Sequence, residues 1–133
     1  MVFGVGTDIL VADRFVPLIG RLEDSFWKKA FTEQEMDGAQ YHDNRLLYYC
    51  SRFAGKEAVF KAISKCKCVF NPKDIEITEL EDGQPLATVS GDTADKMKDF
   101  LGTETEMVIH ISLSFEKDYA IAVAVAETRD IKR

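Results

Sequence analysis

Residues 43–65 read DNRLLYYCSRFAGKEAVFKAISK, the longest run in the chain with a helical pattern. Apolar and small side chains recur along this run at the spacing of one helix face, at Leu47, Cys50, Ala54, Ala58 and Ala62. The run has no proline, and Gly55 is its only residue with a strong bias against helix. We therefore predict a long helix from Asp43 to about Lys65 at the centre of the fold.

Shorter helical pieces are expected on the N-terminal side of this helix. Val11 to Arg21 has apolar residues at helical spacing, and Glu23 to Phe31 forms a second short piece. Thr32-x-x-Glu35 is a capping-box pattern, which indicates that another helix begins there.

The rest of the chain favours strands. The segments with strand character are Val2–Leu10, Asp74–Leu80, Pro85–Val89, Glu106–Ser114 and Tyr119–Glu127. Between them we predict tight turns at 82–83 and 115–118, and an amphipathic helix at 91–101 that ends at Gly102. Residues 128–133 have the character of a fraying tail. The predicted fold class is α+β, with a mainly antiparallel sheet packed against the long central helix.

Length and composition indicate one soluble globular domain over residues 1–133. Hydrophobic residues make up 46% and charged residues 30% of the 133, unlike a disordered chain. No apolar run approaches the roughly 18–20 residues that span a bilayer, and the N-terminus lacks a signal-peptide pattern. The three cysteines have no disulfide-framework spacing, so we expect cytoplasmic thiols and no contact with a membrane.

Charge is unevenly distributed along the chain. The net charge of −6 argues against general nucleic-acid binding. Residues 43–68 nevertheless hold six basic and two acidic side chains, a net of +4, whereas residues 71–108 hold three basic and ten acidic ones, a net of −7. The basic segment fits either a solvated helix face or a local site for an anion.

Two carboxylates stand out for chemistry. Asp8 lies in an otherwise apolar strand, where a charge needs a partner or a metal ion; an N-cap or a salt bridge would satisfy it equally well. Glu57 and Lys61 are four residues apart and share a helix face, as an ordinary surface pair does. Carboxylates from two elements, together with lysine and Arg52, would also suit Mg²⁺ on a diphosphate.

The combination of motifs is more specific than any one of them. Gly4-Val-Gly-Thr-Asp8-Ile, followed by Arg52-Phe-Ala-Gly-Lys-Glu57-Ala-Val-Phe-Lys61-Ala, resembles the holo-acyl-carrier-protein synthase family of small phosphopantetheinyl transferases. Further along, 74–77, Gly83-Gln-Pro85 and 109–114 fit the same family in order. The likeness spans nearly the whole chain, and its length suits the single-domain trimeric type.

The resemblance implies a reaction and a set of roles. The 4′-phosphopantetheine of coenzyme A passes to a serine of apo acyl carrier protein, and adenosine 3′,5′-bisphosphate is released. Asp8 and Glu57 would bind Mg²⁺, with Mn²⁺ as an alternative, and Glu57 would also take the serine proton, directly or through water. Lys61 would bind phosphate or shuttle a proton, and Arg52 would pair with a coenzyme phosphate.

The same resemblance extends to the coenzyme and carrier surfaces. Gly83 and Pro85 would belong to a loop beside the adenine, His110 would contribute to coenzyme binding, and the coenzyme would lie between subunits of a homotrimer. The acidic carrier would dock on the first helix through a set of arginines and apolar anchors, namely Arg14, Arg21, Leu18 and Phe26. Ordinary surface arginines beside core residues are the alternative interpretation.

One position departs from the family pattern. The family often has a histidine that contacts coenzyme phosphate where this chain has Phe115. A phenylalanine can neither donate a hydrogen bond nor exchange a proton, so a histidine role in catalysis is in doubt here. His42, the only other histidine beside His110, has the character of a solvated loop residue.

Two other functions remain open from the sequence. One is a carrier-binding module with weakened catalysis, which Phe115 favours but the intact Asp8, Glu57 and Lys61 do not. The other is a metal-dependent hydrolase of nucleotide diphosphates that uses water as the nucleophile. The sequence does not identify the carrier, which could serve fatty-acid, polyketide or another synthesis.

Overall fold

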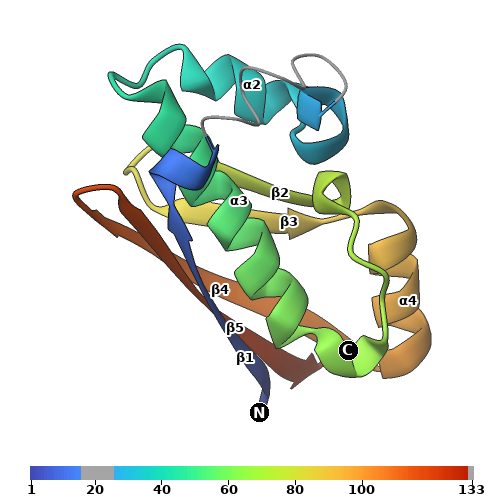
Figure 1. The fold of residues 1–133 in the computed structure, drawn as a ribbon. Helices are drawn as coiled ribbons and strands as arrows, with labels where there is room; N and C mark the ends of the chain where they lie inside the picture. Colours follow the sequence, from blue (N-terminus) through green and yellow to red (C-terminus); the bar gives the residue numbers. More distant parts are fainter. Residues whose placement is uncertain (16–25, 132–133) are drawn as a thin grey trace.

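The computed structural model describes residues 1–15 and 26–131, and the helix α3 (Arg45–Ala62) lies at its centre. Figure 1 shows α3 running across a sheet of three strands, with a separate pair of strands and a second long helix beside it. The sheet has the antiparallel order β1 (Val2–Val11), β5 (Tyr119–Asp130), β4 (Thr105–Glu116). The predicted α+β class is confirmed, with the strands divided between two antiparallel sheets.

The remaining elements surround α3. The second sheet pairs β2 (Ile75–Glu79) with β3 (Pro85–Val89), and α4 (Gly91–Leu101) follows it. Short 3-10 turns at Ser64–Cys66 and Pro72–Asp74 connect α3 to β2. Helix α2 (Glu33–Ala39) begins with the predicted capping box, in which Thr32 and Glu35 exchange hydrogen bonds. Among the described residues, no helix is long and apolar enough to cross a membrane.

Glycines let β1 lie unusually close to α3. A Cβ atom on Gly4 would run into the carbonyl oxygen of Ala62, and a Cβ atom on Gly6 would run into that of Ala58. The strand and the helix therefore touch through their backbones, with small residues on both sides. This close approach carries the next inward-facing residue of the strand, Asp8, to the helix.

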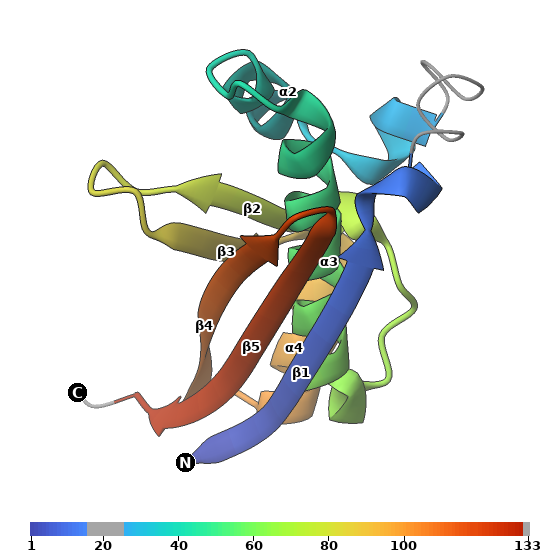
Figure 2. The same ribbon diagram turned by 60° about the vertical axis from the view of Figure 1, so that its left-hand side comes forward.

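The three-stranded sheet has two different faces. The alanines of β5 that face α3 are completely buried, at Ala120, Ala122, Ala124 and Ala126. The opposite face is apolar but open to solvent: Val5 and Ile9 on β1 are 59% and 58% exposed, and Ile121 and Val123 on β5 are each 38% exposed. Figure 2 shows this outer face of the sheet, with α3 behind it.

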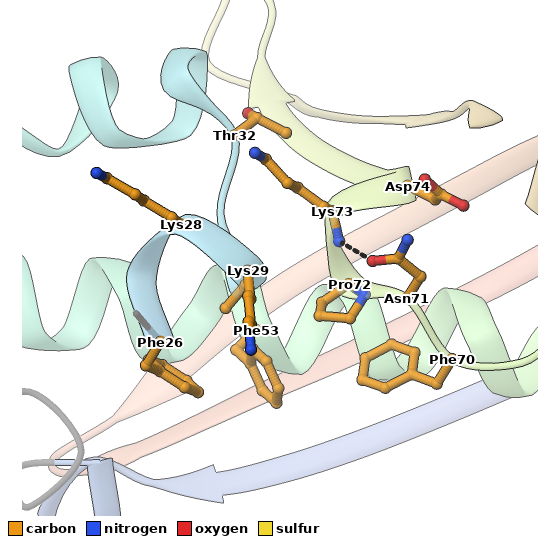
Figure 3. Close-up of a pocket in the computed structure, with 11 residues that line it drawn as sticks. Phe26, Lys28, Lys29, Thr32, Phe53, Phe70, Asn71, Pro72, Lys73 and Asp74 are labelled. Carbon is orange, nitrogen blue, oxygen red and sulfur yellow. Dashed lines mark hydrogen bonds between the residues drawn. The ribbon is translucent and has the colours of Figure 1, made fainter. Parts of the chain in front are cut away.

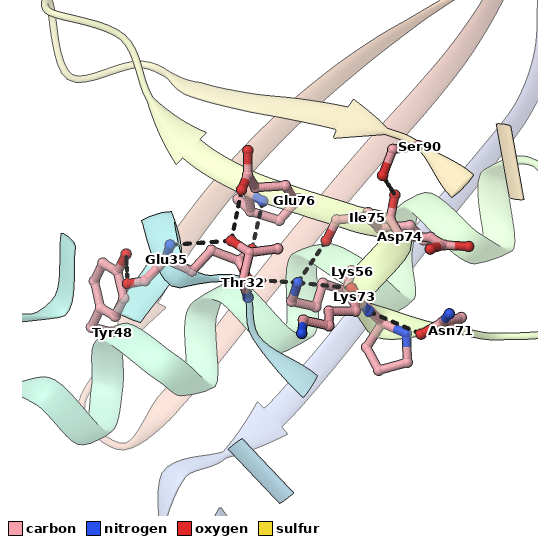
Figure 4. A network of polar contacts seen from close by, with 12 residues as sticks. Thr32, Glu35, Tyr48, Lys56, Asn71, Lys73, Asp74, Ile75, Glu76 and Ser90 are labelled. Atoms are coloured by element: carbon pink, nitrogen blue, oxygen red, sulfur yellow. Dashed lines mark hydrogen bonds and ion pairs between the residues drawn. The ribbon is translucent and has the colours of Figure 1, made fainter. Parts of the chain in front are cut away.

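A buried ion pair joins α2, α3 and β2 (Figure 4). Lys56 Nζ on α3 donates to Glu35 Oε1 at 2.8 Å, and both side chains are fully buried. Lys56 also donates to the carbonyl oxygens of Pro72 and Ile75, while Glu35 Oε2 accepts from Ile77 N at 2.7 Å. Because every strong donor and acceptor has a partner, the pair links three elements without leaving an uncompensated charge.

An aromatic cluster attaches the N-terminal helical residues to the start of α3. Residues 12–15 and 26–30 are helical, and Phe15 is buried against Phe26, Phe31 and Phe53. The predicted helical pieces at 11–21 and 23–31 are therefore confirmed at 12–15 and 26–30, whereas Val11 belongs to β1. Their middle lies outside the described residues.

Several boundaries differ from those predicted. Helix α3 begins at Arg45, because the side chain of Asn44 caps it, and ends at Ala62. The turn after β4 is shorter than predicted, since β4 continues through Glu116. The prediction of a fraying tail is wrong for residues 128–130, which belong to β5, where Thr128 N donates to Met1 O at 2.8 Å.

We expect Gly6→Ala to destabilise the protein strongly, because the added methyl group must push β1 away from α3. The expected loss in the free energy of unfolding is about 2 kcal/mol or more, measured by urea denaturation. Thr7→Ala is the matched control, since Thr7 is exposed on the same strand. Equal, small losses for both variants would show that the close backbone contact is unimportant.

Candidate active site

The first part of the site is a carboxylate held at the contact between β1 and α3. The Asp8 side chain is only 9% exposed, and its Oδ1 lies 3.3 Å from Lys61 Nζ. Lys61 also donates to the carbonyl oxygen of Thr7 at 2.9 Å, which fixes its ammonium group beside the strand. The other oxygen, Asp8 Oδ2, is buried and has no hydrogen-bond partner. A buried carboxylate oxygen without a partner is costly, so this position is suited to a cation.

Glu57 lies next to Asp8 and completes this part of the site. Its pKa is raised from the ordinary value of 4.5 to about 7, first by burial and then by the neighbouring Asp8 carboxylate, whose contact and negative charge both favour the protonated form of Glu57. The Lys61 ammonium opposes the shift. Two carboxyl groups at one half-buried place repel each other unless a proton or a cation lies between them.

The donor set fits a hard divalent cation. Mg²⁺ binds proteins through one or two carboxylates and completes its shell with water and substrate phosphates. Asp8 and Glu57 offer such a pair, and the buried Asp8 Oδ2 is the oxygen that lacks a partner. Among the described residues no cluster of three or more potential ligands occurs, so substrate and water would supply the remaining ones.

Arg52, Gly83 and Pro85 come together at a second place. They line a cavity of about 430 Å³ with Tyr48, Leu113 and Phe115. The Arg52 side chain is 7% exposed and donates to Glu79 Oε1 at 2.6 Å. Its guanidinium lies over the Tyr48 ring, 4.1 Å from the ring centre. The predicted coenzyme loop and arginine thus share one cavity.

The two places lie toward opposite edges of the sheet. Arg52 and Glu57 are five residues apart on α3, which separates them by about 140° around the helix axis. Glu57 faces Asp8 of β1, whereas the Arg52 cavity is lined by Leu113 and Phe115 of β4. Because β5 lies between β1 and β4, the carboxylates and the arginine open in different directions.

His110 lies away from both places. It is on the outer face of the three-stranded sheet, where its Nε2 is 2.8 Å from Glu127 Oε1. It does not line the Arg52 cavity, whereas His42 does. A coenzyme role for His110 stays a prediction. His42 lies in a loop, as predicted, but its ring contacts Tyr48 and its Nε2 lies 3.6 Å from Glu79 Oε1.

A third place lies beside the helical residues 26–30 (Figure 3). It is a cavity of about 690 Å³ with Phe26, Phe53 and Phe70 among its lining residues. The lining also includes three lysines, Lys28, Lys29 and Lys73. An apolar surface rimmed by positive charge is typical of a docking site for an acidic partner.

The predicted carrier residues are only partly described. Arg14 is exposed and Phe26 is half-buried at the cavity in Figure 3. Leu18 and Arg21 lie outside the described residues, so their predicted role remains a prediction from the sequence.

The sequence analysis missed two groups that the structure brings to these places. Glu79 reaches Arg52 from the end of β2, and the lysines at 28, 29 and 73 line one cavity from two separate segments. Glu79 gave no local signal, because its partner is 27 residues away. The adjacent lysines at 28–29 were a visible basic pair, but only the fold brings Lys73 to them.

Comparisons with known proteins give a consistent result. Residues 4–124 match the model of the 4′-phosphopantetheinyl transferase superfamily. A holo-[acyl-carrier-protein] synthase of Dinoroseobacter shibae is 32% identical over 126 residues, which cover 94% of this chain and 91% of that protein.

Solved structures agree in fold over nearly the whole chain. Holo-[acyl-carrier-protein] synthase from Neisseria meningitidis is 27% identical with a TM-score of 0.78, and the match covers 96% of this chain and 99% of that one. The enzyme from Bacillus anthracis, in complex with CoA (3′,5′-ADP), is also 27% identical, with a TM-score of 0.71 and coverage of 95% and 96%.

Two substitutions beside Glu57 should shift its pKa in opposite directions. Asp8→Asn removes a negative charge, so the pKa of Glu57 should fall, although burial keeps it above the ordinary 4.5. Lys61→Met removes the opposing positive charge, so the same pKa should rise above about 7. Carbon-13 NMR titration of the glutamate carboxyl groups, without divalent ions, measures both. Shifts in the same direction would contradict this account of the site.

Proposed function

The chain belongs to the 4′-phosphopantetheinyl transferase superfamily, and we propose that the Asp8–Glu57 pair is the centre at which it performs that chemistry. The enzyme transfers the 4′-phosphopantetheine group of coenzyme A to a serine of apo acyl carrier protein. The observation that carries the proposed site is the half-buried carboxylate pair beside Lys61, with its unpartnered oxygen on Asp8.

The reaction requires a nucleophile, a base and a leaving group. The serine oxygen of the carrier attacks the phosphorus that bears the pantetheine. The bond from that phosphorus to the oxygen of the adenosine 5′-phosphate breaks, and adenosine 3′,5′-bisphosphate leaves. Glu57 takes the serine proton, directly or through a water molecule.

Asp8 and Glu57 would hold Mg²⁺ or Mn²⁺ through their carboxylate oxygens. Bound there, the ion supplies positive charge that offsets the diphosphate and the developing charge on the leaving group. Lys61, held by Thr7 and Asp8, adds a fixed ammonium group for the phosphate oxygens. Each residue thus has a role that follows from its position at the contact between β1 and α3.

Incubation with coenzyme A, Mg²⁺ and an apo carrier, followed by intact mass measurement, tests the reaction and separates it from the alternatives. Transfer adds one phosphopantetheine to the carrier. Cleavage of coenzyme A without a carrier would instead identify a diphosphate hydrolase. Binding of the carrier with neither reaction would identify a non-catalytic module.

Glu57→Gln should abolish nearly all transfer while leaving the protein folded, because glutamine keeps the size but loses both the base and the charge that hard cations prefer. The rate of carrier modification and the melting temperature measure the two effects. Glu33→Gln makes the same chemical change on the exposed surface of α2 and should behave like the wild type. Activity at the wild-type level in Glu57→Gln would eliminate the site.

A homotrimer would bring the separated parts of the site together. One coenzyme molecule must meet the carboxylates with its diphosphate and the Arg52 cavity with its adenosine end, yet these open toward opposite edges of the sheet. In a cyclic assembly the β1 edge of one subunit can face the β4 edge of the next. The exposed apolar face of the sheet, with Val5, Ile9 and Ile121, is the surface that such an assembly would bury.

Light scattering should therefore give a mass of about 45 kDa, three times the 15.0 kDa of one chain. Ile121→Lys places a charge at the centre of the apolar sheet face and should shift the protein toward monomers that lack activity. Leu86→Lys is the control, because Leu86 is similarly exposed, at 41%, on the other sheet. A fully active monomer would contradict a site shared between subunits.

The carrier would dock on the N-terminal helical residues and the adjoining cavity. Arg14 is exposed there, and Lys28, Lys29 and Lys73 rim the apolar cavity that contains Phe26 (Figure 3). An acidic carrier helix would meet these cations while one of its apolar side chains enters the cavity. A cytoplasmic location remains a prediction from the sequence.

Charge reversal tests this docking surface. Arg14→Glu and Arg21→Glu should each raise the apparent KM for the carrier about tenfold, equivalent to about 1.4 kcal/mol, and leave the KM for coenzyme A unchanged. The wild-type rate should also fall as salt screens the charges. Lys98→Glu on α4 is the control, away from this surface. Unchanged carrier KM and salt dependence in both arginine variants would exclude this helix as the docking surface.

A further inference from the structure

The Arg52 cavity contains an ion pair that competes with its proposed ligand. Arg52 donates to Glu79 Oε1 at 2.6 Å, and its ring contact with Tyr48 holds the guanidinium in place. Arg52 Nε is buried and has no hydrogen-bond partner. The guanidinium is thus fixed in the cavity wall. One of its terminal N–H groups is paired with the Glu79 carboxylate, and its Nε–H group has no acceptor.

The charges of the cavity do not favour a phosphate as they stand. Among the described residues that line it, Arg52 is the only permanent cation, whereas Glu79 and Asp43 are both acidic. Glu79 also lies 3.6 Å from His42 Nε2, so it faces both basic groups of the cavity. Phe115, which lines the same cavity, cannot contribute a donor. An entering phosphate would therefore meet Glu79 before it could use Arg52 fully.

Glu79 is placed so that its side chain can turn away from Arg52. It is the last residue of β2, next to the turn at 80–84, and its side chain is 40% exposed. Because Glu79 is much more exposed than Arg52, water can solvate its carboxylate when it turns away, and an entering phosphate replaces it as the anion beside the buried guanidinium. Arg52, in contrast, is held by its burial and by Tyr48, so the carboxylate is the partner that moves.

We propose that Glu79 is a specificity-determining residue that competes with the 3′-phosphate of the coenzyme for Arg52. This inference rests on the proposed function, in which the diphosphate belongs at Asp8 and Glu57. The phosphate left for the Arg52 cavity, beside the adenine loop at Gly83 and Pro85, is then the 3′-phosphate. Glu79 lowers the preference for ligands that carry it, and it acts through Arg52 rather than by touching the reacting atoms.

Binding of two nucleotides tests the competition directly. Adenosine 3′,5′-bisphosphate carries the 3′-phosphate and adenosine 5′-monophosphate lacks it, and calorimetry gives the Kd of each. Glu79→Gln should tighten binding of the bisphosphate by roughly fivefold or more and leave binding of the monophosphate within about twofold. Glu81→Gln removes a charge from the adjacent exposed turn and should change neither Kd.

A double-mutant cycle shows whether Glu79 acts through Arg52. In an Arg52→Gln background, Glu79→Gln should give no further gain in bisphosphate affinity. Phosphopantetheine transfer is measured separately on the wild type. Absence of transfer there would overturn the proposed function, whereas the nucleotide affinities decide the role of Glu79.

Three outcomes would overturn the role of Glu79. Weaker bisphosphate binding in Glu79→Gln would mean that the carboxylate positions Arg52 for the ligand. Equal changes for both nucleotides would mean a general charge effect. No change in either Kd would mean that no competition exists.

Discussion

The backbone contact between β1 and α3 is the constraint from which the site follows. Gly4 and Gly6 let the strand approach the carbonyl oxygens of Ala62 and Ala58, and no side chain could fit between them. The next inward-facing position, Asp8, therefore lies against the helix beside Glu57 and Lys61. A wider spacing would let water reach the carboxylates, and their charges would then interact only weakly.

The rest of the fold keeps α3 in a single position relative to that strand. The buried Glu35–Lys56 pair attaches the helix to α2 and β2 through the residue immediately before Glu57 (Figure 4). Because a buried charge that loses its partner costs about 3–5 kcal/mol, the helix cannot rotate or slide without a large penalty. The same helix presents Arg52 toward the opposite edge of the sheet, so the position of α3 fixes the directions in which the carboxylates and the arginine face.

The sequence predicts the local features well because they depend on nearby residues. The spacing of small residues at 47–62 gives the helix, alternation gives the strands, and the family motifs bring Asp8, Glu57 and Lys61 into one prediction. The pairing of Glu79 with Arg52 depends on contacts between distant segments, which no local pattern contains. The extension of β5 to Asp130 was missed for the same reason, since its hydrogen bonds go to Met1 and to β4.

Mixing two inactive variants tests the central claim, that the carboxylates of one subunit work with the Arg52 cavity of another. Arg52→Glu and Glu57→Gln subunits are unfolded together and refolded, and carrier modification is followed by intact mass. Each mixed trimer would contain one interface with both residues intact, which gives about one third of the wild-type activity per mixed trimer. An equal mixture should therefore reach about one quarter of the wild-type activity, because about one quarter of its trimers contain a single variant. If the mixture stays as inactive as either variant alone, the site lies within one chain and the account is contradicted.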